Sequence, residues 1–113
     1  MQGPTLLACA LMLAAPLLVI GAQATPRPAS PKPVSIVIDN LTYGPPPAHL
    51  RAGDRLTWVN RDLFRHSATA DDKSFDVDLQ PGKQAQIVLK RPGVYSYFCK
   101  FHPGMKGKVI VSR

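Results

Sequence analysis

The sequence predicts an all-β domain, built as a small antiparallel sandwich or barrel. From residue 34 onward, short apolar runs alternate with turns rich in glycine and proline, and no stretch shows helical periodicity over a useful length. The chain has 113 residues, which is enough for one domain at most. No internal repeat is visible in it.

The expected strands follow from the alternation of side chains along the chain. FDVDL alternates strictly, with Phe75, Val77 and Leu79 on one face and Asp76 and Asp78 on the other. Turns such as QPGK and RPG separate such segments from one another. The expected strands are residues 35–39, 55–60, 75–79, 84–90, 94–99 and 108–113.

Residues 1–24 have the pattern of a secretory signal peptide. Residues 5–20 are almost wholly apolar and uncharged, and AQA at residues 22–24 matches the small-residue signal for cleavage before Thr25. An uncleaved membrane anchor is the alternative. Cleavage predicts an exported, periplasmic protein.

The mature chain is expected to divide into a tether and a domain. Residues 25–33 contain four prolines and no large apolar side chain, which predicts an extended, flexible tether ahead of a domain at 34–113. Cys9 leaves with the signal peptide, so Cys99 is the one cysteine that remains and no internal disulfide is available. Because small exported domains often depend on disulfides or a metal, we expect a metal at Cys99.

The charge of the chain is unbalanced. It has 14 Lys and Arg against 7 acidic residues, for a net charge of +7. This excess favours acidic partners or surfaces, although a general solubility bias explains it equally well. Export, and the lack of any recognised binding motif, argue against a nucleic-acid partner.

The stretch YFCKFHPGM, residues 97–105, carries three metal-binding side chains at steps of three: Cys99, His102 and Met105. The strand alternation places Cys99 on the same face as Tyr95 and Tyr97, at the end of a strand. Pro103 limits how far the following loop can relax. His66, just past an earlier strand, supplies a second imidazole. One thiolate, two imidazoles and a distant thioether form the donor set of a blue-copper electron-transfer site.

The order His66, Cys99, His102 and Met105 resembles the cupredoxin family, and C-x-x-H-P-x-M most resembles its amicyanin branch. The resemblance covers residues 34–113, including AGDRLTWVN, GVYSYFC and GKVIV. It implies a Greek-key sandwich holding one type 1 copper ion that cycles between Cu(II) and Cu(I). It also implies that His102 is the partly exposed ligand where electrons enter, inside an apolar ring whose candidates are Phe64, Pro103 and the prolines at 45–47.

One residue departs from the family pattern. Ser67 follows the first histidine ligand, where the family often has an asparagine that ties the two ligand loops together. The resemblance therefore leaves the rigidity of this site as a question for the structure.

Taken singly, each of these residues has a simpler interpretation. Cys99 fits an inert buried thiol, Met105 a core residue, and His66 and His102 ordinary loop residues. The joint pattern favours a metal site, whereas His49 has no comparable support and is expected at the surface.

Three other functions use the same donors. A copper carrier would hold Cu(I) for delivery, a zinc site is conceivable during heterologous expression, and a cysteine enzyme lacks a third group to orient its histidine. We therefore expect an electron carrier and not an enzyme. It should be a monomer with redox protein partners of acidic character and no stable membrane insertion after signal cleavage. At least some of five cations are expected to rim His102, namely Arg61, Arg65, Lys100, Lys106 and Lys108.

Overall fold

The structure is a computed structural model that describes residues 1–5, 10–23 and 33–113. Outside the domain, the described residues form no helix or strand. In the described part of the chain, no helix has the length and apolar character needed to cross a membrane. The predicted cleavage point and nearly all of the predicted tether lie outside the described residues. Pro33, the last residue assigned to the tether, is instead the first residue of strand β1 (Pro33–Asp39).

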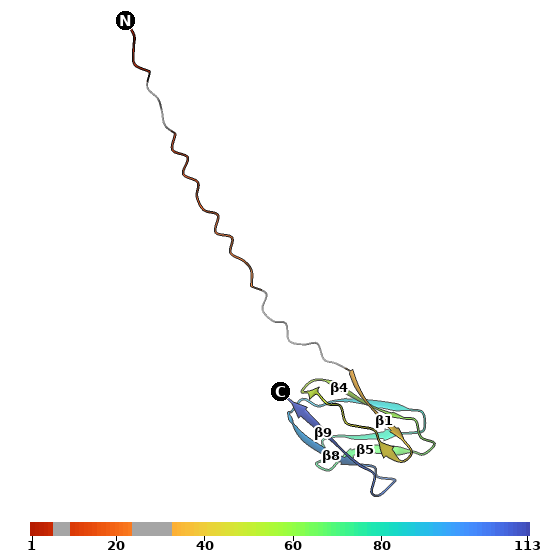
Figure 1. Cartoon of the computed structure of the whole chain (residues 1–113). Helices are drawn as coiled ribbons and strands as arrows, with labels where there is room; N and C mark the ends of the chain where they lie inside the picture. The colour runs from red at the N-terminus through yellow and green to blue at the C-terminus, as the bar shows by residue number, and fades with distance from the viewer. Residues whose placement is uncertain (6–9, 24–32) are drawn as a thin grey trace.

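The domain is a sandwich of two sheets (Figure 1). One sheet has the order β2 (Thr42–Tyr43), β1 (Pro33–Asp39), β4 (Arg55–Asn60) and β7 (Gln84–Val88). The other has the order β3 (Leu50–Arg51), β9 (Lys106–Ser112), β8 (Gly93–Phe98), β5 (His66–Ala70) and β6 (Asp76–Leu79). The predicted all-β sandwich is confirmed.

Both sheets are mixed and not wholly antiparallel. β1 pairs with β4 in parallel, from Pro33 opposite Arg55 to Ile38 opposite Asn60, and the short strand β3 pairs in parallel with β9. β4 runs parallel to β1 because residues 40–54 return the chain to the end of the sheet where β1 begins. Parallel pairing needs such a crossover, and the alternation within a strand does not report it.

Strand β5 was not predicted as a strand. Its sequence, HSATA, has small side chains in place of large apolar ones, so its alternation is weak. The structure places β5 inside the second sheet, between β8 and β6, with Ala68 and Ala70 buried. Small residues suit this position because the sandwich core already contains several aromatic rings.

Side chains from both sheets meet in one buried core. Trp58 is fully buried, and its ring centroid lies 5.4 Å from that of Tyr97. Tyr43 packs edge-on against Tyr97 at 4.7 Å. Cys99 and Met105 belong to the same cluster, so the candidate metal centre is continuous with the packed interior.

Candidate metal centre

Three of the predicted donors come together at one end of the sandwich. His66 is the first residue of β5, Cys99 directly follows β8, and His102 lies in the loop before β9. Cys99 Sγ is 3.7 Å from His66 Nδ1 and 3.6 Å from His102 Nδ1, and all three donor atoms lie within 4.8 Å of one another. His66 and Cys99 are 0% and 2% exposed, whereas His102 is half-buried.

The spacing of these atoms fits a trigonal metal. With bonds of about 2.0 Å to nitrogen and about 2.3 Å to sulfur, as at zinc sites, a trigonal ion separates its sulfur and nitrogen donors by about 3.7 Å. The two sulfur-to-nitrogen distances match this value. A soft thiolate with two imidazoles also has the donor chemistry of a blue-copper site.

Met105 closes the loop that carries Cys99 and His102. The Cys99 N–H donates to the Met105 carbonyl at 3.0 Å, and the Met105 N–H donates to the His102 carbonyl at 3.1 Å. Gly104 has a φ of +94°, a left-handed conformation that glycine adopts without strain. The Met105 side chain is buried in the core cluster with Cys99. Its role as an axial donor stays a prediction.

The surroundings of Cys99 favour its thiolate form. Burial raises the pKa of the Cys99 thiol, but the hydrogen bonds to the sulfur lower it by a larger amount. The pKa is therefore about 6, which is below the ordinary value for cysteine. The first of these hydrogen bonds comes from the Ser67 N–H at 3.4 Å, and the Phe101 N–H gives another. The Nδ1 atoms of His102 and His66 also face the sulfur, and these contacts lower its pKa as well. Since the thiolate is the form that binds metals, the site is prepared for a metal before one arrives.

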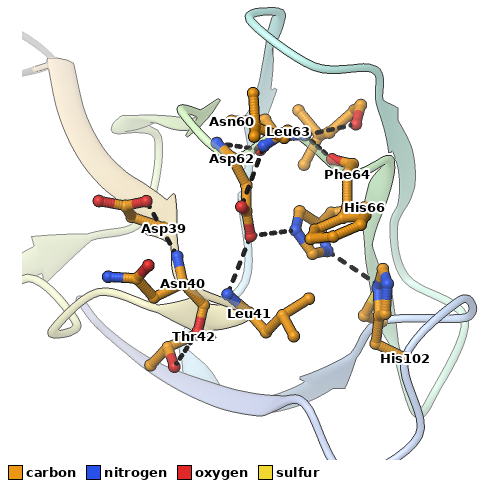
Figure 2. Close-up of polar contacts among 12 residues, drawn as sticks. Asp39, Asn40, Leu41, Thr42, Asn60, Asp62, Leu63, Phe64, His66 and His102 are labelled. Atoms are coloured by element: carbon orange, nitrogen blue, oxygen red, sulfur yellow. Dashed lines mark hydrogen bonds and ion pairs between the residues drawn. The ribbon is translucent and has the colours of Figure 1, made fainter.

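Asp62 orients His66, a role that the sequence did not reveal. Figure 2 shows one carboxylate oxygen of Asp62 between the Leu41 backbone and the His66 ring. Asp62 Oδ2 accepts the Leu41 N–H at 2.9 Å and lies 2.9 Å from His66 Nε2. These two hydrogen bonds lower the pKa of Asp62, so the carboxylate stays ionised and accepts a hydrogen bond from the Nε2–H of His66. That tautomer leaves Nδ1 free to face a metal.

Asn60 holds the segment that leads to His66. Its side chain is fully buried and donates to the carbonyls of Phe64 and Leu79 at 2.7 and 2.8 Å, while its oxygen accepts the Asp62 N–H at 2.9 Å (Figure 2). The one sequence signal for these two polar residues is their place at the buried end of β4, with Asn60 as its last residue and Asp62 two residues on, just ahead of a predicted ligand.

One exposed apolar side chain, that of Phe64, packs against the His102 ring. The Phe64 ring is 6.0 Å from the His102 ring, and Leu41, Leu63, Phe64 and Phe101 are all exposed. This agrees with the expected place of Phe64 in an apolar ring. The prolines at 45–47 were also expected there, but Pro46 and Pro47 line a hollow of about 330 Å³ together with His49, Leu50, Ile110 and Ser112.

Two of the five candidate cations for a rim around His102 are paired with aspartates of β6. Arg65 forms an ion pair with Asp78, and Lys100 Nζ lies 3.0 Å from Asp76 Oδ2. The Arg65 guanidinium also lies over the Phe101 ring, 4.3 Å from its centroid. These two aspartates lie beside the site because β6 is paired with β5.

Comparison with known proteins agrees with this fold and donor set. A family model described as a cupredoxin-like domain matches residues 7–111. The chain belongs to the cupredoxin-like family. Within that family it is amicyanin-like, as its relatives and structural neighbours indicate.

Amicyanin from Paracoccus denitrificans is 31% identical over 85 residues, which cover 68% of this chain and 65% of that protein. Amicyanin-alpha from Methylorubrum extorquens is 28% identical over 110 residues, with 92% of both chains covered. The crystal structure of amicyanin from Paracoccus versutus aligns with a TM-score of 0.62 at 30% identity, covering 77% of this chain and 86% of that one. The match to the Paracoccus denitrificans relative thus spans slightly less than two thirds of its length.

Proposed function

We propose that the protein is an exported type 1 copper protein that carries single electrons between redox partners. The observation that carries this proposal is the cluster of one thiol and two imidazole nitrogens, with sulfur-to-nitrogen distances of 3.6 and 3.7 Å. The lowered pKa of Cys99 and membership in the cupredoxin-like family support it. Several structural neighbours are amicyanin variants in reduced, oxidised or Cu(I) forms.

In this proposal four residues hold the ion. Cys99 would bind as the thiolate, His66 and His102 would bind through Nδ1, and the Met105 thioether would supply a weaker fourth donor. Bound copper supplies a one-electron couple between Cu(II) and Cu(I). Asp62 fixes the His66 ring, and the two backbone hydrogen bonds of the loop fix Cys99 relative to Met105. Donors that are already in place need little rearrangement when the electron moves.

The position of His102 suggests the route of the electron. His102 is the half-buried donor, while His66 and Cys99 are enclosed. Its ring packs against the exposed side chain of Phe64, which a partner protein can cover. Four protein donors leave no open coordination position for a substrate, which favours a carrier over an enzyme.

The cellular setting is part of the same proposal. The signal-peptide pattern of residues 1–24 supports export to the periplasm, and the net charge of +7 supports a redox partner with an acidic surface. We infer that the mature protein acts as a monomer, without nucleic acid and without stable membrane insertion.

Repeated redox cycling in the presence of a Cu(I) chelator tests electron transfer against copper delivery. Copper-loaded protein should retain one copper per chain through many cycles of reduction and reoxidation. Cys99→Ser should lose its copper, whereas His49→Ala, which changes an exposed histidine outside the cluster, should behave like the unaltered protein. Transfer of copper to the chelator at each reduction would instead identify a copper carrier.

A further inference from the structure

Four residues form a closed ring of hydrogen bonds next to the candidate metal centre. The Lys100 N–H donates to Ser67 Oγ at 2.9 Å, and Ser67 Oγ lies 3.0 Å from Thr69 Oγ1. Thr69 Oγ1 donates to Asp76 Oδ1 at 2.9 Å. The Lys100 Nζ donates to the other oxygen of Asp76 at 3.0 Å and so closes the ring.

The direction of each hydrogen bond in the ring is determined. The Thr69 hydroxyl has one proton, which it gives to Asp76, so the Ser67 hydroxyl must be the donor to Thr69. The lone pairs of Ser67 Oγ are then free to accept the Lys100 N–H. All donors point along one chain that ends on a carboxylate, an arrangement in which neighbouring hydrogen bonds strengthen one another.

The ring connects the segments that carry the two enclosed donors. Ser67 directly follows His66 on β5, and Lys100 directly follows Cys99. Ser67 is fully buried and also donates its N–H to the Cys99 sulfur. Substitution of any residue in the ring can therefore shift the Cys99 sulfur relative to the His66 imidazole.

We propose that Ser67, Thr69, Asp76 and Lys100 form a clamp that positions Cys99 against His66. In this clamp Ser67 takes up the link between the two ligand loops that an asparagine often makes in the family. A serine side chain is shorter than asparagine, and the hydroxyl of Thr69 and the carboxylate of Asp76 hold it in place. Thr69 and Asp76 are positioning residues, and Asp76 acts on the metal centre from the surface. The effect on copper rests on the proposed function, whereas the clamp itself does not.

Thr69→Val tests the clamp because it removes the hydroxyl and keeps a branched side chain suited to a strand. Its first readout is hydrogen exchange of the Lys100 amide in metal-free protein, which we expect to become about threefold to tenfold faster, the size of one lost hydrogen bond. The second readout is the rate at which a chelator removes copper from the loaded protein, which should rise by a similar factor. Thr69→Ser retains the hydroxyl and should restore both rates.

The ion pair between Arg65 and Asp78 provides a matched control. Asp76 and Asp78 are both exposed, lie on β6 and pair with a cation beside the site, but Asp78 is outside the ring. Asp76→Ala should accelerate amide exchange and copper loss, and Asp78→Ala should leave both close to their original values.

Two outcomes would overturn the clamp. The first is an exchange rate of the Lys100 amide that does not change in Thr69→Val. The second is an equal change of amide exchange and copper loss in Asp76→Ala and Asp78→Ala, which would mean that any lost negative charge near the site has the same effect. A protein that binds no copper would refute the proposed function, while the exchange measurement on metal-free protein would still decide whether the clamp exists.

Discussion

At the scale of single residues, Asp62 places a negative charge against a proposed ligand. Hydrogen bonds from the Leu41 N–H and from His66 keep its pKa low, so it is ionised at neutral pH. An anion beside the imidazole stabilises the more highly charged Cu(II) state relative to Cu(I). Asp62→Asn keeps an acceptor of similar shape but removes the charge. We expect it to raise the reduction potential by about 59 mV, which is a tenfold change for a one-electron couple.

Potentiometric titration of the copper-loaded variants measures this shift. Asp39→Asn is the control, because Asp39 also accepts a backbone N–H beside the turn that contains Leu41, but is exposed and has no hydrogen bond or ion pair to a proposed ligand among the described residues. Equal reduction potentials for Asp62→Asn and the unaltered protein would show that the charge of Asp62 does not affect the potential of the metal.

The residues of the site differ in how far the sequence reveals them. Cys99, His66 and His102 could be predicted because cysteine and histidine are uncommon residues and their joint order and spacing match the donors of a metal site. Asn60 and Asp62 could not, because amides and carboxylates occur in most loops. The role of Asp62 depends on the turn before β2 meeting the segment after β4, and that of Asn60 on the end of β6 lying beside β4.

At the scale of elements, the turn between β1 and β2 contains backbone strain beside the site. Asn40 and Leu41 have φ values of 50° and 58°, a left-handed conformation that asparagine tolerates and leucine does not. Leu41→Gly relieves this strain and keeps the N–H that Asp62 accepts. We expect it to increase the free energy of unfolding by about 1 kcal/mol, since left-handed backbone costs an ordinary residue about 1–2 kcal/mol.

Chemical denaturation of metal-free protein measures this gain. Leu63→Gly is the comparison, because Leu63 is exposed and has no positive φ. There glycine should lower the free energy of unfolding, because it only adds freedom to the unfolded chain. A loss of stability in Leu41→Gly as well would mean that the packing of the Leu41 side chain outweighs the strain.

The elements that were predicted correctly are those with strong local alternation, such as FDVDL and the strand before Cys99. β5 lacked large apolar side chains, and β2 and β3 have two residues each, too few for any periodicity. The parallel pairing of β1 with β4 depends on the path of the chain over residues 40–54. Local patterns carry no information on such a path.

At the scale of the whole molecule, the excess of positive charge is distributed unevenly around the site. Lys100 and Arg65 are paired with aspartates. Lys106 and Lys108 line a surface hollow that one acidic residue, Asp71, also lines, and within the described residues no ion pair includes either lysine. Lys106 and Lys108 should therefore contribute more to attracting an anion than Lys100 does.

Oxidation of the reduced protein by hexacyanoferrate(III) measures this attraction. The second-order rate should fall as salt is added, because a Debye length of about 10 Å at 0.1 M leaves little long-range steering. Lys106→Glu should weaken this salt dependence more than Lys90→Glu, which changes an exposed lysine just after β7. Equal effects at the two positions would indicate that net charge alone governs the encounter.

The visible absorption spectrum of the copper-loaded, oxidised protein tests the central claim most directly. A Cys99 thiolate bound to Cu(II) in a trigonal site should give an intense blue colour from charge transfer between sulfur and metal. Cys99→Ser should abolish this band, because a hydroxyl oxygen is a hard donor without such a transition. A colourless protein that nonetheless holds one copper per chain would contradict the account.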